Sequence, residues 1–181
     1  MLDVKPLAIP EVLLITPARH GDARGWFAET WNRKAYAAAG VTNDFLQDNQ
    51  AYNARAGTLR GIHFQRSPHA QAKLVRVLKG AILDVAVDLR AGSASFGRWV
   101  AAELTAERGE QLLVPRGFGH AYQTLTDDCE LTYKVDGDYA PELEGGVIWN
   151  DPDLAIAWPL APSVLSPRDQ TLPMLKDVEA L

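Results

Sequence analysis

Short runs in which hydrophobic and polar residues alternate recur along the chain, and glycine or proline separates several of them. The clearest run extends from Leu83 to Leu89, where leucine and valine alternate with Asp84, Ala86 and Asp88. An alternation with a period of two predicts a half-buried β-strand. Further strands are predicted at residues 12–15, 26–31, 45–52, 58–66, 73–78, 99–104, 111–114, 120–125 and 130–135. Turn residues at this short spacing favour an all-β sandwich, jelly roll or barrel over a parallel α/β fold.

Helical signals are few. Asn32 is a suitable N-cap for a short helix through residues 34–39, and Gly40 is a suitable stop. The segment from Trp158 onward is rich in proline and lacks periodicity, so we expect it to wrap around the barrel and to end in a short helix. We therefore expect residues 1–181 to form one domain of strands with a few short peripheral helices.

Composition and charge limit the classes of function. The 181 residues are 47% hydrophobic and 23% charged, which is typical of a soluble globular protein. A net charge of -5 argues against non-specific binding of nucleic acid. Cys129 is the single cysteine, which excludes an intrachain disulfide and indicates a reducing cytoplasm. No segment reaches about 18 uninterrupted apolar residues, so we expect no membrane span. The N-terminus lacks the basic region and the long apolar stretch of a secretory signal, so we do not expect export by such a signal.

Two basic side chains between residues 58 and 79 are candidates for chemistry. Period two places Lys73 on the same strand face as Val75 and Val77, where an ammonium either reaches out of a barrel mouth or is held inside for a purpose. His63 comes before the turn at Ser67-Pro68, so the returning chain can set His63 and Lys73 over one cavity. In the simpler interpretation, His63 is a core histidine and Lys73 is a charge at a strand end.

A tight corner precedes the strand that begins at His120. The spacing of Pro115, Gly117 and His120 resembles the second half-motif of the cupin superfamily, whose metal-binding members also carry a His-x-His motif followed by a glutamate. Here the corresponding run is His63-Phe64-Gln65, and no acidic residue follows before Asp84. This pattern indicates a jelly roll without its metal ligands, in which an active cavity needs an organic acid and base.

A closer resemblance covers nearly the whole chain. The motifs are Arg24-Gly25-Trp26-Phe27-x-Glu29, Leu59-Arg60-Gly61-Ile62-His63-Phe64-Gln65, Gln71-Ala72-Lys73, Asp84-x-x-x-Asp88-x-Arg90, Phe96-Gly97, Pro115-x-Gly117-Phe118-x-His120, Tyr133, Tyr139 and Ser166-x-x-Asp169. In this order and spacing they resemble the dTDP-4-dehydrorhamnose 3,5-epimerase family. The resemblance implies a cupin-type jelly roll, a homodimer with exchanged N-terminal strands, and no metal or redox cofactor.

The resemblance also implies roles for four residues. The substrate is a dTDP-linked 4-keto-6-deoxyhexose, in which carbons 3 and 5 flank the ketone. Each epimerisation needs a base on one face of the ring, an acid on the other and positive charge at the ketone oxygen. His63 is the expected base, with Asp169 orienting its imidazole as in a triad. Tyr133 is the expected proton donor, and Lys73 is expected to stabilise the enolate oxygen.

Further residues are expected to bind the nucleotide and the sugar. Arginine suits a diphosphate because its planar fork donates two parallel hydrogen bonds. The position before Asp169 is lysine in many family members and arginine here, which keeps the charge. The resemblance implies Arg24, Arg60 and Arg168 for the phosphates and sugar, Glu29 with Gln47, Asp48 and Asn49 for the base and sugar edges, Phe27 of the partner subunit and Tyr139 for stacking on thymine, and His120 and Glu144 as further contacts.

One geometric condition limits this site. Strict alternation puts Arg60 and His63 on opposite faces of their strand, so both can line one cavity only if Gly61 bends or bulges it. Other functions also stay open. They are an epimerase acting at carbon 3 or carbon 5 alone, a noncatalytic carbohydrate-binding cupin, and a metal-dependent cupin oxygenase that uses His63 and His120.

Overall fold

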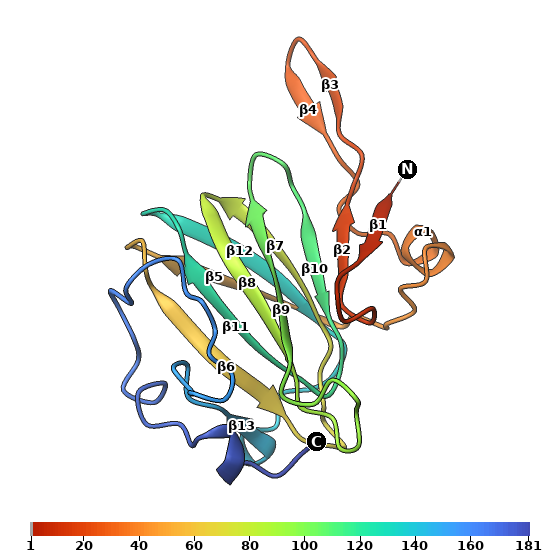
Figure 1. Ribbon diagram of the computed structural model, residues 1–181. Coiled ribbons are helices and arrows are strands. Elements are labelled where there is room, and N and C mark those ends of the chain that lie inside the picture. The colour runs from red at the N-terminus through yellow and green to blue at the C-terminus, as the bar shows by residue number, and fades with distance from the viewer. Residues whose placement is uncertain (1) are drawn as a thin grey trace.

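The chain folds into two curved β-sheets that face each other (Figure 1). The computed structural model describes residues 2–181. The six-stranded sheet has the order β1-β2-β10-β7-β12-β5 and the five-stranded sheet the order β13-β6-β11-β8-β9. The strands are β1 (Asp3–Pro6), β2 (Leu13–Thr16), β5 (Gln47–Asn53), β6 (Leu59–Gln65), β7 (Lys73–Lys79), β8 (Ala81–Asp88), β9 (Trp99–Thr105), β10 (Gln111–Val114), β11 (Phe118–Thr124), β12 (Cys129–Val135) and β13 (Glu144–Gly146). The predicted all-β jelly-roll class is confirmed.

The apolar residues that alternate along the strands form the core between the two sheets. Leu104, Leu112 and Leu131 in this core are completely buried. Full burial of one such side chain stabilises the fold by roughly 1.5–3 kcal/mol relative to exposure. These residues therefore hold the two sheets together around an apolar interior. Tyr133 packs against the edge of this core, where apolar side chains give way to polar ones. The candidate active site lies at this boundary.

Strand β8 differs from its prediction, because it is buried on both faces. Val85 and Val87 point to a second apolar cluster, in which Leu154 and Leu175 from the C-terminal segment cover the outer face of the five-stranded sheet. The opposite row of β8 faces the core between the sheets and holds Asp84, which is completely buried. The alternation therefore does not separate a wet face from a dry one. It separates two buried environments.

The predicted helix is present as α1 (Arg33–Ala38). The side chain of Asn32 accepts a hydrogen bond from the backbone N–H of Ala35 at 3.0 Å, so Asn32 is the N-cap. Gly40 has a positive φ of 91°, which suits the end of the helix. Two single-turn 3-10 helices, η1 (Pro141–Leu143) and η2 (Leu175–Asp177), follow in the C-terminal part.

A two-stranded hairpin, β3 (His20–Asp22) and β4 (Gly25–Phe27), projects away from the two sheets (Figure 1). The strand predicted over residues 26–31 is wrong beyond Phe27, because the residues that follow connect the hairpin to α1. Trp26 and Phe27 in this hairpin are 58% and 70% exposed to solvent. Within residues 2–181, the structure contains no helix long and apolar enough to span a membrane.

Candidate active site

A cavity of about 330 Å³ opens at one end of the jelly roll and is lined by both sheets. The five-stranded sheet contributes side chains from β6, β11 and β13, and the six-stranded sheet contributes side chains from β5, β7 and β12. The cavity therefore presents two facing walls to any ring that enters it. Its lining residues are Gln47, Asn49, His63, Phe64, Gln65, Gln71, Lys73, Phe118, Tyr133, Tyr139 and Glu144.

His63 lies in this cavity with Asp169 behind it. The Nε2 atom of His63 is 2.7 Å from Oδ1 of Asp169, which comes from a loop 106 residues further along the chain. An ionised carboxylate only accepts hydrogen bonds, so Nε2 carries the proton and Nδ1 is left as the basic nitrogen. Asp169 is buried, whereas the side chain of His63 is 27% exposed. The pair therefore presents a basic imidazole to the cavity and keeps its carboxylate away from solvent.

The Asp169 carboxylate is held ionised by its hydrogen bonds. Burial alone would raise the pKa of Asp169, but the hydrogen bond and charge of His63 outweigh burial and lower this pKa. The backbone N–H of Gly61 also donates to Asp169 at 3.3 Å, and the backbone N–H of Asp169 itself donates to the Ser166 hydroxyl at 3.0 Å. These contacts fix the orientation of the carboxylate, and the carboxylate in turn fixes the imidazole.

Strand β6 contains the bulge that the site requires. Arg60 pairs with Tyr122 of β11, and His63 pairs with His120, so β6 has one more residue than β11 between the two pairs. His120 and Tyr122 are two positions apart and share a face, and Arg60 and His63 therefore share a face as well. Gly61 sits in the bulge with a φ of 118°, and a Cβ there would lie 2.6 Å from the His120 carbonyl oxygen. Only glycine fits this position without displacing the neighbouring strand.

Lys73 brings positive charge to the wall formed by the six-stranded sheet. Burial lowers the pKa of Lys73 to about 8, and the negative charges of Asp84 and Glu144 oppose this shift. Lys73 follows the row of Val75 and Val77, as its position in the strand predicts, and both valines are buried in the core. An ammonium in this partly dry position interacts strongly with a negative oxygen that enters the cavity.

Tyr133 points into the cavity from β12, the strand next to β7. Its neighbours on the same face, Leu131 and Val135, are buried in the sheet. Burial raises the pKa of Tyr133, Arg60 lowers it and Glu144 raises it again. The phenol therefore stays protonated at neutral pH, as a proton donor must be. Since His63 belongs to the five-stranded sheet and Tyr133 to the six-stranded sheet, the two side chains approach the cavity from opposite walls.

Three predicted binding residues meet at the rim of the cavity. The carboxylate of Glu144 accepts a hydrogen bond from the Tyr139 hydroxyl at 3.0 Å and forms an ion pair with Arg168 at 2.7 Å, both through Oε2. Burial would raise the pKa of Glu144, but the hydrogen bonds from Arg168 and Tyr139 lower it. Arg60 is exposed on β6 and does not line the cavity, and its side chain donates to Oδ1 of Asn53 at 3.0 Å.

His120 lies behind the cavity wall and does not line the cavity. Its Nε2 atom is 2.7 Å from Oδ1 of Asp84, and both residues are buried. Burial lowers the pKa of His120, and the charge of Asp84 opposes this shift. Within this chain His120 contacts a buried carboxylate, and its role as a substrate contact stays a prediction. Among residues 2–181, no three His, Cys, Asp or Glu side chains gather as a group able to hold a metal ion.

Comparison with known proteins identifies the family. A sequence profile described as dTDP-4-dehydrorhamnose 3,5-epimerase matches residues 6–177. The dTDP-4-dehydrorhamnose 3,5-epimerase of Sinorhizobium fredii is 47% identical over 174 residues, which are 93% of this chain and 87% of that protein. The chain belongs to the dTDP-4-dehydrorhamnose 3,5-epimerase family.

Two similar solved structures contain a bound sugar nucleotide. The dTDP-6-deoxy-D-glucose-3,5-epimerase of Legionella pneumophila, in complex with dTDP-4-keto-L-rhamnose, is 39% identical with a TM-score of 0.94 and covers 99% of this chain and 95% of its own. A 3'-monoepimerase of Streptomyces bikiniensis, in complex with dTDP-quinovose, is 40% identical with a TM-score of 0.87 and covers 94% of this chain and 87% of its own. The family fold thus accompanies epimerases that differ in the number of carbons they act on.

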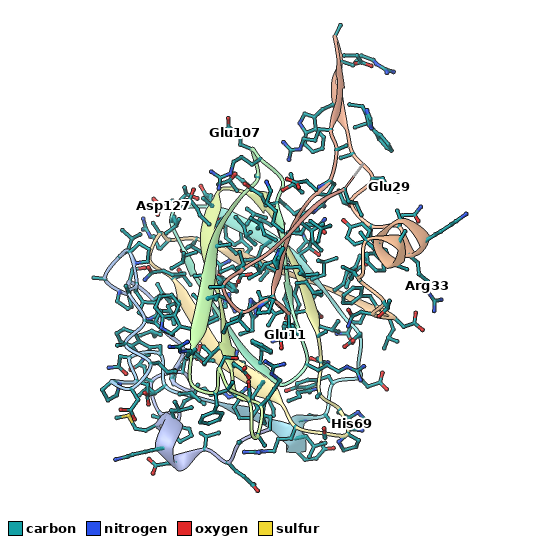
Figure 2. The ribbon with its side chains drawn as sticks, turned by 45° about the vertical axis from the view of Figure 1, so that its right-hand side comes forward. Glu11, Glu29, Arg33, His69, Glu107 and Asp127 are labelled. Carbon is teal, nitrogen blue, oxygen red and sulfur yellow. The ribbon has the colours of Figure 1, made fainter. Side chains whose placement is uncertain are left out.

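Some predicted family residues lie away from the cavity of their own chain. Arg24 and Phe27 belong to the projecting hairpin, and the Arg24 side chain is 90% exposed and paired with Asp22. Glu29 lies at the base of this hairpin and well away from His69 (Figure 2). His69 belongs to the loop that reaches the cavity at Gln71.

The predicted run of residues 47–49 divides between the two faces of β5. Gln47 and Asn49 line the cavity, but alternation along β5 turns Asp48 to the outer face of the six-stranded sheet. There Asp48 forms an ion pair with Lys134 at 2.7 Å. Asp48 is therefore not part of the cavity within one chain.

Sequence reasoning did not assign roles to four lining residues, Phe64, Gln65, Gln71 and Phe118. Gln65 could have been found, because it occupies the position of the second histidine in a metal-binding cupin motif. Its buried amide donates to the carbonyl oxygens of His69 and Asp138 and accepts from the backbone N–H of Ala140. Gln65 therefore fastens the loops on both sides of Tyr139 to strand β6.

Proposed function

We propose that this protein is a dTDP-4-dehydrorhamnose 3,5-epimerase that uses no metal or redox cofactor. It converts dTDP-4-dehydro-6-deoxy-D-glucose into dTDP-4-dehydro-L-rhamnose by removing and returning a proton at C3 and at C5. One observation carries the proposal. An imidazole paired with a carboxylate and a half-buried phenol line the same cavity from opposite sheets, with an ammonium beside them.

His63 acts as the base at each carbon. The protons at C3 and C5 are acidified by the neighbouring ketone, so an imidazole can remove them. The proton moves from carbon to Nδ1 of His63, the electron pair of the broken C–H bond forms a C=C bond to C4, and the π pair of the carbonyl moves onto the ketone oxygen. Asp169 stabilises the imidazolium that results, because its carboxylate faces the N–H on the other side of the ring.

Lys73 and Tyr133 complete each step. The ammonium of Lys73 stabilises the enolate oxygen, which gains charge only after the proton has left carbon. Tyr133 then donates its phenolic proton to the opposite face of the same carbon, the carbonyl re-forms and the configuration is inverted. Each cycle leaves one proton on His63 and a phenolate on Tyr133, and both groups return to their starting state by exchange with solvent.

The rim residues hold the nucleotide. Arg168 and Arg60 supply positive charge for the diphosphate and sugar, and Tyr139 supplies an aromatic face for thymine. Glu144 pairs with both Arg168 and Tyr139, so it sets their positions before the ligand arrives. Gln47 and Asn49 provide amide groups at the same end of the cavity.

We further propose a homodimer in which the projecting hairpin completes the cavity of the second chain. The hairpin leaves Trp26 and Phe27 largely exposed, which is unfavourable for an isolated chain. Its position supports a role in trans, because Arg24, Phe27 and Glu29 do not line the cavity of their own chain. Of these, Glu29 lies well away from His69 (Figure 2). We place the enzyme in the cytoplasm, and its one cysteine, Cys129, is buried and free, which fits a reducing compartment.

The test is conversion of dTDP-4-dehydro-6-deoxy-D-glucose in D2O, followed by proton NMR. We expect deuterium at both C3 and C5 and formation of the L-rhamno product. Incorporation at one carbon only would establish the alternative of a single-carbon epimerase, which the similarity to the 3'-monoepimerase makes worth testing. Absence of deuterium at both carbons, with tight binding of the nucleotide, would establish a noncatalytic binding protein instead.

A further inference from the structure

The carboxylate of Asp84 is only half satisfied in the interior of the jelly roll. Asp84 is completely buried on β8, and its Oδ1 atom meets Nε2 of His120 at 2.7 Å. Its Oδ2 atom is buried and has no hydrogen-bond partner among residues 2–181. A buried polar atom without a partner is costly, and native proteins keep few of them. The reaction described above assigns no role to Asp84.

The other buried carboxylate of the same strand shows the contrast. Asp88 lies on the same face of β8, four residues further on, and is completely buried as well. Both of its oxygens are satisfied, because it receives hydrogen bonds from Arg90, Ser93 and Ser95. The sheet can therefore satisfy a carboxylate in this row, and the unpaired oxygen of Asp84 is a local feature.

Lys73 is the complementary group. Its ammonium lines the cavity and makes no side-chain hydrogen bond with residues 2–181. Asp84 is the first of the two charges that raise the pKa of Lys73 against the effect of burial, and Glu144 is the second. Lys73 and Asp84 come from opposite sheets, and both point into the space between them. The charged and titratable groups around Lys73 are Asp84 from β8, Glu144 from β13, His120 from β11, His63 from β6 and Tyr133 from β12.

We propose that Asp84 is a positioning residue that keeps the Lys73 ammonium charged and directed at the ketone oxygen of the substrate. His120 holds the carboxylate in place through Oδ1, and the negative charge of Asp84 acts on the Lys73 ammonium across the interior between the two sheets. This role rests on the proposed epimerase function, because it gives Lys73 the charge that the enolate requires. It explains why a carboxylate and a histidine occupy a position that apolar residues would fill at lower cost.

The first measurement does not depend on activity. Protein labelled with ¹⁵N at lysine Nζ is titrated from pH 6 to pH 11 by NMR, and the Lys73 signal is assigned from its loss in Lys73→Arg. We expect Asp84→Asn to lower the titration midpoint of Lys73 by about one pH unit or more, since it removes the larger opposing charge. Asp151→Asn is the matched control, because Asp151 is also buried but binds backbone N–H groups of the C-terminal segment. An unchanged midpoint in Asp84→Asn overturns the proposal.

The second measurement is the pH profile of kcat/KM for the epimerisation. Loss of the ammonium weakens enolate stabilisation, so the wild-type rate should fall above about pH 8, and the fall should begin at lower pH in Asp84→Asn. We expect a loss of about fivefold or more at pH 8 that becomes smaller toward pH 6. Arginine remains charged throughout, so Asp84→Asn should not move the alkaline limb in a Lys73→Arg background. A loss that is equal at every pH indicates a structural role and contradicts the proposal.

These outcomes separate two kinds of failure. If the wild-type protein exchanges no proton at C3 or C5, the proposed function is wrong, while the lysine titration still tests the pairing of Asp84 and Lys73. If the wild-type protein exchanges both protons and the titration midpoint of Lys73 is the same in Asp84→Asn as in the wild type, only the positioning role is wrong. Asp84→Ser provides a second variant that leaves room for water beside His120, and we expect it to lower the midpoint in the same direction as Asp84→Asn.

Discussion

Arg60 and His63 project from the same face of strand β6, although three positions separate them. A regular strand would turn them to opposite faces, and the extra residue at Gly61 removes this conflict. The bulge brings the basic imidazole to the same side as a guanidinium that lowers the pKa of Tyr133. The geometry of the site therefore depends on a single glycine.

Gly61→Ala should damage both the fold and the site. Its Cβ would lie 2.6 Å from the backbone oxygen of His120 and would force an alanine into a φ of 118°. We expect a loss of about 2–4 kcal/mol in the free energy of unfolding, measured by urea denaturation, together with most of the activity. Gly21→Ala is the control, because a Cβ there meets only one atom, at 3.7 Å, and φ is not strained. Equal stability of the two variants would contradict this account of the bulge.

Tyr133→Phe should separate proton removal from proton return. His63 remains in place, so we expect deuterium from D2O to enter a ring carbon while the inverted product fails to accumulate. The assay is proton NMR of the sugar nucleotide over time. Tyr122→Phe serves as a control, because Tyr122 is also a buried tyrosine of the interior but its hydroxyl faces Asn53 and it does not line the cavity. Normal product formation by Tyr133→Phe would remove the phenol from the mechanism.

The buried ammonium of Lys73 should lower the free energy of unfolding of the protein. Burial lowers the pKa of Lys73 in the folded state to about 8 from the ordinary value of 10.5, so the unfolded chain binds more protons between these two values. Stability should therefore rise from pH 8 to pH 10.5 as this penalty disappears. Lys73→Met should stabilise the protein by about 1–3 kcal/mol at pH 7 and by progressively less as the pH approaches 10.5. Thermal unfolding across this pH range provides the measurement.

Lys79→Met is the matched control for Lys73→Met, since Lys79 lies on the same strand but is exposed. We expect its stability to follow that of the wild-type protein at every pH. A Lys73→Met variant that is less stable than the wild type at pH 7 would show that the ammonium is not held at a cost.

The hairpin can be tested by combining two impaired chains in one dimer. Phe27→Ala should raise KM, and His63→Asn should abolish turnover, when each variant is assembled alone. In a mixed dimer one cavity combines the intact His63 of one chain with the intact Phe27 of the other. Co-expression in equal amounts should restore about a quarter of the wild-type sites, because half of the dimers are mixed and each has one intact cavity. Activity that equals the average of the two separate variants would contradict completion in trans.

The strands could be predicted because alternation is a local property of the sequence. The burial of β8 on both faces could not, because Leu154 and Leu175, which cover its outer face, are far away in the chain. For the same reason β8 was expected to show Asp84 to solvent, whereas Asp84 is buried. Local pattern identifies an element, but the environment of each face depends on distant segments.

The candidate site shows the same division. Parity put Lys73 on one strand face with Val75 and Val77, either reaching out of a barrel mouth or held inside, and the structure shows Lys73 in the lining of the cavity together with Tyr133. Parity also turns Asp48 outward, whereas the family resemblance treats residues 47–49 as one unit, and the role of Asp48 in binding stays a prediction. The contact between His63 and Asp169 spans 106 residues, so only the resemblance to a family could supply it.

The central claim is that one imidazole removes the protons from both carbons. The most direct measurement is deuterium incorporation from D2O at C3 and at C5, followed by NMR in wild-type protein and in His63→Asn at equal saturation with dTDP-4-dehydro-6-deoxy-D-glucose. The account predicts incorporation at both carbons in the wild type and at neither carbon in His63→Asn, with the affinity for dTDP nearly unchanged. Continued exchange at either carbon in His63→Asn would contradict the claim, because a second base would then have to serve that carbon.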